Sequence, residues 1–149
     1  MAQYINRVRA FDFDMMVMVI GQSLSPGNEQ HNYWDSESAI FNDANYLQTR
    51  WRLDFSKNKI SVEVAFNHGE AIAWNLMKPV LASELNHVEK EAQTRLGVVI
   101  MATEEMKRAG GFDGAVGTFE KAERYLKPLQ NQLSCPMVLI GLNAPESFI

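Results

Sequence analysis

The sequence has a single cysteine, Cys135, among its 149 residues. One thiol cannot close an intramolecular disulfide, so the sequence is not that of a disulfide-stabilised secreted scaffold. We expect Cys135, which precedes Pro136, to be a buried structural thiol. No apolar run approaches the roughly 20 residues that span a membrane, and the first residues lack the features of a signal peptide. The expectation is a cytoplasmic protein without membrane association.

Positive charge is also scarce, since 14 lysines and arginines against 18 aspartates and glutamates give a net charge of -4. This balance argues against a basic protein that coats nucleic acid, but it does not exclude a nuclease, which gathers acidic residues around a metal. The three histidines, His31, His68 and His87, lack a short ligand spacing such as HxxxH, so no zinc site is predicted. The composition, 46% hydrophobic and 21% charged, is typical of one globular domain.

The patterns of apolar residues predict an α/β protein with a mixed central sheet flanked by helices. In chain order they predict a buried strand over 11–20, a loop over 21–32, a short helix over 36–47 with Ser36 as its N-cap, strands over 49–55 and 59–66, a helix over 70–91, a strand over 96–103, a helical turn and glycine-rich loop over 103–117, a helix over 119–133 and a strand over 136–142. Pro79 lies inside the longest helix, where a kink or a new helix start is expected. The apolar stripe of that helix comprises Trp74, Met77, Leu81, Leu85 and Val88.

The two strands of the hairpin at 53–68, LDFSKNKISVEVAFNH, each carry one carboxylate on the face opposite their large apolar residues. Ile60 and the next three even-numbered residues are expected to point inward, and Glu63 and Ala65 to the opposite face. If Phe55 faces Ile60 across the turn, Asp54 and Glu63 are diagonal neighbours roughly 7–8 Å apart.

Two adjacent carboxylates repel each other, so one takes up a proton or a cation neutralises both. Mg²⁺ prefers carboxylate oxygens and water, with a substrate phosphate completing its shell, and it lowers the pKa of a bound water. The pair Asp54 and Glu63 therefore points to metal-dependent cleavage of phosphodiesters. The alternative is a solvated hairpin in which Arg52 pairs with Glu63, and Lys57 or Lys59 with Asp54.

Several motifs from about residue 50 onward together resemble one known family. They are LDF, a short basic turn, VEVAFNH, the helix EAIAWNLMKPVLASELNHVEK, the strand GVVIMAT, the helix EKAERYLKPLQNQL and the strand PMVLIGL. Over about residues 50–142 this string resembles the restriction endonucleases of the BglII and BstYI type, a branch of the PD-(D/E)XK nuclease fold. The resemblance implies a restriction-endonuclease-like core that uses Mg²⁺ to cut double-stranded DNA as a homodimer.

By this resemblance, Asp54 and Glu63 are the two catalytic, metal-binding acids, and the main-chain carbonyl of Val64 is a third metal ligand. The family places Lys, Glu or Gln two residues after the second acid, to orient or activate water. This chain has Ala65 there, which has no polar side-chain atom.

Three explanations of Ala65 remain open. The role has moved to a catalytic Asn67 on the same strand face, or to Lys78 or Lys90 on the following helix; or the protein binds DNA and metal but cuts slowly; or it is inactive. His68 is either at the rim of the site or a surface residue.

The loop over 109–117, AGGFDGAVG, lacks the pattern of a phosphate-binding loop. The two basic residues before it, Lys107 and Arg108, are candidate DNA phosphate contacts.

Residues 3–39 resemble a different family. The matching stretches are 12–18 and SLSPGNEQ at 23–30, and they resemble a segment of the family 5 extracellular solute-binding proteins, which bind oligopeptides. The buried strand predicted in this segment is a candidate additional strand of the sheet.

The domain prediction is one domain over 1–149, with a solute-binding-protein-like segment over 1–40 and a nuclease-like core over 49–145. Three functions follow as hypotheses: a Mg²⁺-dependent endonuclease, a non-catalytic DNA-binding or composite scaffold protein, and a fragment of a periplasmic peptide-binding protein.

Overall fold

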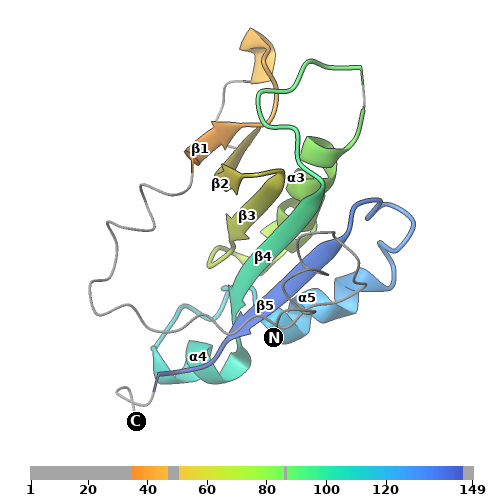
Figure 1. Cartoon of the computed structure of the whole chain (residues 1–149). Helices are drawn as coiled ribbons and strands as arrows, with labels where there is room; N and C mark the ends of the chain where they lie inside the picture. The colour runs from red at the N-terminus through yellow and green to blue at the C-terminus, as the bar shows by residue number, and fades with distance from the viewer. Residues whose placement is uncertain (1–34, 47–50, 86, 146–149) are drawn as a thin grey trace, which may run out of the picture.

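The computed structural model describes residues 35–46, 51–85 and 87–145. Figure 1 shows one sheet within these residues, accompanied by short helices. The elements are β1 (Asp35–Ala39), η1 (Ala44–Tyr46), β2 (Arg52–Lys57), β3 (Ile60–Val64), η3 (Gly69–Ala71), α3 (Ile72–Ser83), β4 (Leu96–Ala102), α4 (Glu104–Ala109), α5 (Phe119–Leu126) and β5 (Met137–Leu142). The strand and loop predicted over 11–20 and 21–32 lie outside the described residues.

The sheet contains the five described strands in the order β1-β2-β3-β4-β5. The β1–β2 and β2–β3 pairs are antiparallel, whereas β3–β4 and β4–β5 are parallel. Parallel neighbours need a crossover, which α3 provides between β3 and β4, and α4 with α5 between β4 and β5. The predicted α/β class with a mixed sheet and flanking helices is therefore confirmed, as is the predicted order of the last six elements.

The helix predicted over 36–47 is wrong for most of its length. Residues Asp35–Ala39 form β1, in which Ser36 pairs with Phe55 and is therefore not a helix N-cap. Within the described part of this span, residues 36–46, the helical residues are Ala44–Tyr46, which form a single 3₁₀ turn. The helix signal in this segment is weak, and pairing with β2 overrides it. β2 supplies backbone hydrogen-bond partners for β1, and its Leu53 packs with Ile40 and Phe41 just after β1.

The long helix is shorter than predicted and buries a different face. α3 ends at Ser83, Pro79 lies inside it without ending it, and Leu85 beyond it is 84% exposed. Its buried residues are Ile72, Asn75, Leu76, Lys78, Pro79, Val80 and Ala82. The predicted stripe is wrong because a reading of hydrophobicity places the polar Asn75 and Lys78 on the outer face, whereas both are buried with polar partners.

α3 packs very closely on β4. A Cβ atom added at Gly97 would lie 2.5 Å from Cβ of Pro79, so only glycine allows this approach of helix to strand. α3 and α5 share one core cluster with the sheet, formed by Ala65, Ile72, Leu76, Val99, Met101 and Ala122. A second cluster, formed by Ile40, Phe41, Leu53, Ala82 and Ala92, joins the segment after β1 to β2 and the end of α3.

The remaining predicted elements are present, one of them shortened. β4, α4 and β5 lie where the sequence predicts them, and Cys135 just before β5 is buried. α5 ends at Leu126, and turns follow it instead of the helix predicted to residue 133. In the part of the chain that the structure describes, no helix has the length and apolar character needed to cross a membrane.

Candidate active site

The hairpin of β2 and β3 turns more tightly than the sequence suggests. Asn58 and Lys59 both have positive φ, 49° and 67°, as in a two-residue type I′ turn. Lys57 pairs with Ile60, and Phe55 pairs with Val62, so the predicted pairing of Phe55 with Ile60 is wrong. Continuing the observed register by one residue places Asp54 directly opposite Glu63, closer than the predicted diagonal arrangement.

The faces of β3 are the reverse of the predicted ones. Ser61, Glu63 and Ala65 are each at most 2% exposed, whereas Val64 is 36% exposed. The physical reason is that α3 covers the Glu63 face, and the buried polar groups of that face have partners on α3 or on the neighbouring strand. Ser61 Oγ, for example, donates a hydrogen bond to the main-chain oxygen of Leu96. Glu63 therefore lies between sheet and helix instead of on an open surface.

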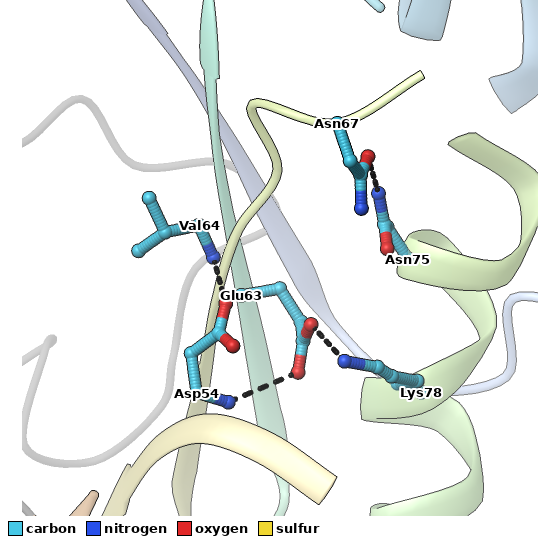
Figure 2. Close-up of polar contacts among 6 residues, drawn as sticks. All are labelled: Asp54, Glu63, Val64, Asn67, Asn75 and Lys78. Carbon is cyan, nitrogen blue, oxygen red and sulfur yellow. Dashed lines mark hydrogen bonds and ion pairs between the residues drawn. The ribbon is translucent and has the colours of Figure 1, made fainter. Parts of the chain in front are cut away.

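Asp54 and Glu63 hold the two strands together where the backbone pairing stops. Asp54 Oδ2 accepts a 2.7 Å hydrogen bond from the main-chain N–H of Val64. The N–H of Asp54 donates in turn to Glu63 Oε1, at 3.4 Å (Figure 2). Each carboxylate thus binds the backbone of the opposite strand. Such contacts orient both acids without a bound ligand.

Lys78 reaches Glu63 from α3. Its Nζ donates to Glu63 Oε2, and the two side chains are only 9% and 3% exposed (Figure 2). Burial raises the pKa of Glu63 to about 7; the Lys78 ammonium opposes this rise and the Asp54 charge adds to it. The carboxylate of Glu63 is therefore costly in this place unless a positive charge accompanies it.

Asn67 lies just after β3, beside α3. The side chain of Asn75, which is buried on α3, donates a 2.9 Å hydrogen bond from Nδ2 to Asn67 Oδ1 (Figure 2). Asn75 and Lys78 are three residues apart on the helix and therefore point to the same side. The helix thus contacts both the second acid and the exposed Asn67. Asn67 was a candidate catalytic residue, and that role stays a prediction.

Ala65 is a core residue. Its side chain is 2% exposed in the cluster that contains Ile72 and Leu76, and its N–H donates to the main-chain oxygen of Ile100 at 2.8 Å. The other lysine considered at the sequence level, Lys90, lies elsewhere. Its Nζ donates to the main-chain oxygen of Leu81 and sits 4.3 Å above the ring of Phe41.

The two candidate DNA contacts lie on α4. Lys107 Nζ donates to the main-chain oxygens of Gly114 and Val116, at 2.7 and 2.9 Å, so it holds the glycine-rich loop against the helix. Arg108 Nε donates to the main-chain oxygen of Glu104 at 3.3 Å, and the residue is exposed. Their contact with DNA stays a prediction.

The two histidines among the described residues are exposed. His68 precedes η3 and is exposed, and its role at the rim stays a prediction. His87 is also exposed and has a positive φ of 60°. His31 lies outside the described residues.

The donor groups fit a hard divalent cation. Asp54 and Glu63 offer carboxylate oxygens on opposing strands, and a positive charge between them would relieve the repulsion that contributes to the raised pKa of Glu63. Within the described residues no three His, Cys, Asp or Glu side chains gather into a metal cage. A cation at the pair would take its remaining ligands from main-chain oxygen, water or substrate, as Mg²⁺ commonly does.

The mixed five-stranded sheet with its flanking helices has the fold of the restriction endonucleases. The crystal structure of restriction endonuclease BglII complexed with a DNA 16-mer has a TM-score of 0.61 and 21% identity to this chain, and the match covers 76% of this chain and 49% of that chain. The chain belongs to the family "Restriction endonuclease BglII/BglIII", whose family model matches residues 23–142. This match starts earlier than the predicted resemblance and includes β1.

Short stretches are similar to other proteins. A stretch of 38 residues is 63% identical to the uncharacterized protein y4wM of Sinorhizobium fredii, covering 26% of this chain and 6% of that protein. An alignment of 46 residues with the probable peptide-binding protein YejA of Agrobacterium fabrum is 44% identical and covers 31% of this chain and 8% of that protein. An alignment of 37 residues with a putative binding protein of Brucella melitensis is 51% identical and covers 25% of this chain and 6% of that protein. These matches are local and span less than a tenth of each relative.

Proposed function

We propose that this protein is a Mg²⁺-dependent endonuclease that hydrolyses phosphodiester bonds of double-stranded DNA at a short site. The observation that carries the proposal is the pair Asp54 and Glu63, which face each other across the central hairpin of a chain that belongs to a restriction endonuclease family. Both acids are oriented by backbone contacts, which is how a site is prepared before its substrate arrives.

Asp54, Glu63 and the main-chain oxygen of Val64 are the groups proposed to hold the ion. A bound Mg²⁺ supplies a water of lowered pKa and neutralises charge on the phosphate. The protein's own part is to keep the two carboxylates ionised and in place, through the N–H of Val64 at Asp54 and the ammonium of Lys78 at Glu63. Asn67, whose Oδ1 is engaged by Asn75, has its Nδ2 to offer a phosphate oxygen.

Double-stranded DNA is the proposed partner because the structural neighbour is described as a complex with a DNA 16-mer. A homodimer follows if each subunit cuts one strand of a two-fold symmetric site. Arg108 and the loop held by Lys107 are the proposed phosphate contacts. Light scattering of the protein with a short cleavable duplex in Ca²⁺ tests the assembly: two chains per duplex support it, and one chain contradicts it.

Cleavage of supercoiled plasmid tests the activity. Wild type, Asp54→Asn and Glu63→Gln are compared in Mg²⁺, in Mn²⁺ and in EDTA, with Glu123→Gln on the exposed face of α5 as the matched control. Discrete cuts that need metal, survive in Glu123→Gln and disappear in both site variants support the proposal. A folded wild type that leaves the plasmid intact in every metal contradicts it.

One observation favours a second candidate, a DNA-binding protein without activity. Ala65 is packed in the core and cannot take part in water activation. A wild type that binds plasmid DNA in Ca²⁺ but does not cut it in Mg²⁺ or Mn²⁺ would establish this second function.

A further inference from the structure

Ala65, two residues after the second acid Glu63, has no side-chain group that can take part in catalysis. The side chain of Ala65 is a methyl group buried beside Ile72 and Leu76, so it offers no polar atom to the acid pair. An endonuclease that acts at Asp54 and Glu63 then lacks one group, a donor beside the second acid that orients water and opposes the negative charge on the phosphate.

Lys78, on α3, places its positively charged ammonium group beside Glu63. Its ammonium contacts Glu63 Oε2, and the side chain is only 9% exposed. The ammonium has three N–H donors, and the contact with Glu63 uses one. The close packing of α3 on β4, which Gly97 allows, keeps the helix and its lysine at this depth.

We propose that Lys78, on α3, supplies the positive charge and the hydrogen-bond donors beside Glu63 that the side chain of Ala65 does not. This inference rests on the proposed endonuclease function. During hydrolysis, the water oxygen bonds to phosphorus and one P–O ester bond breaks. The departing oxygen takes up a proton, and the attacking water gives up one to solvent. The part proposed for Lys78 is that of a hydrogen-bond donor.

The other candidates for this role are less suited. Lys90 is engaged by the main-chain oxygen of Leu81 and the ring of Phe41. Asn67 is neutral, and its Oδ1 is bound to Asn75. Lys59 is exposed in the turn of the hairpin, at the opposite end of β3 from Ala65. The ammonium of Lys78, by contrast, is in direct contact with Glu63.

Stability alone is a weak reason for a buried ion pair. Removing two charges from water costs several kcal/mol per ion, and apolar pairs of similar size are often as stable or more stable. A buried lysine in contact with the acid pair is better explained by what its charge does in the reaction.

Three variants and three measurements test the role. Lys78→Met removes the charge, Lys78→Arg keeps it, and Lys90→Met is the matched control with a second partly buried lysine. The measurements are the single-turnover cleavage rate in Mg²⁺, the affinity for uncut duplex in Ca²⁺, and the affinity for Mn²⁺ at pH 8.5. Thermal unfolding checks that each variant is folded.

Lys78→Met is expected to cut about a hundredfold more slowly or worse, since a lost charge donor at the reacting centre typically costs that much. Its affinities for duplex and for Mn²⁺ are expected to be no weaker than those of wild type, because a positive neighbour of the cation is gone. Lys78→Arg is expected to cut within about tenfold of wild type, and Lys90→Met at the wild-type rate.

Cutting by Lys78→Met at the wild-type rate overturns the role of Lys78 and leaves the endonuclease function standing. Parallel loss of cutting, duplex binding and Mn²⁺ binding in a folded Lys78→Met also overturns it, because that pattern marks structural support only. A wild type that cuts no DNA overturns the function and the role together. If Lys78→Met does not fold, Lys78→Arg decides: a folded variant without cleavage overturns the role.

Discussion

The main-chain N–H of Asp54 lies 3.4 Å from Glu63 Oε1, and the carboxylate of Asp54 accepts the N–H of the residue after Glu63. The two acids therefore replace the backbone hydrogen bonds of the hairpin just beyond the Phe55–Val62 pair. These backbone contacts orient both carboxylates without water or ligand. They also bring two negative charges close together, which is unfavourable. The site combines order with electrostatic strain, which a cation would relieve.

Unfolding should depend on pH through Glu63. Because its folded pKa, about 7, lies above its ordinary value of 4.5, the native state binds more protons between these values. Stability is therefore highest below pH 4.5, as far as this group is concerned, and falls as pH rises to 7, by a total on the order of 3 kcal/mol. Urea unfolding in EDTA at pH 4.5 and pH 8 measures the fall, which Glu63→Gln should lack. Equal falls in both proteins would show that another group is responsible.

The buried pair should behave as a unit in a double-mutant cycle. Lys78→Met alone leaves a buried carboxylate without its partner and should cost about 3–5 kcal/mol at pH 8. Glu63→Met with Lys78→Met should come within about 1 kcal/mol of wild type, because no charge is then left buried. Urea unfolding of the four proteins gives the coupling energy, and additive single effects would mean that the contact is not formed in solution.

Placing a lysine at position 65 should not speed cleavage. Ala65 is 2% exposed within its core cluster, so Ala65→Lys should lower the free energy of unfolding by about 1–3 kcal/mol and leave cleavage no faster. Ala109→Lys, on the exposed end of α4, is the matched control and should leave stability unchanged. Faster cleavage by a stable Ala65→Lys protein would show that position 65 opens into the site.

Gly97 should be sensitive to a single methyl group. Gly97→Ala brings a Cβ within 2.5 Å of Pro79 and should push α3 away from β4, at a cost of about 1–3 kcal/mol. Cleavage should fall as well, because α3 carries Lys78. Gly114→Ala, where the added Cβ meets no atom within 4 Å, is the control measured by the same thermal unfolding. Equal stability of the two variants would contradict the close packing.

The sequence predicts the sheet and the acid pair because both depend on local patterns. Alternation predicts β2 and β3, continuous apolar runs predict β4 and β5, and Asp54 and Glu63 follow from their positions beside one turn. β1 is missed because its strand forms only through pairing with β2.

The face of α3 is misjudged for a different reason. Lys78 and Asn75 are buried with polar partners, Glu63 in β3 and Asn67 just after it. The periodicity of apolar residues does not reveal such partners. The sequence alone offers both Lys78 and Lys90, and only the packing of α3 on the sheet distinguishes the two.

Binding of Mn²⁺ to the protein without DNA tests the central claim most directly. Isothermal titration at pH 8 is carried out on wild type, Asp54→Asn, Glu63→Gln and the control Glu123→Gln. If Asp54 and Glu63 share a divalent ion, wild type and Glu123→Gln bind Mn²⁺, and each isosteric site variant loses at least about tenfold in affinity, the equivalent of 1.4 kcal/mol. Equal Mn²⁺ binding by all four folded proteins would contradict the claim that this pair is the metal site.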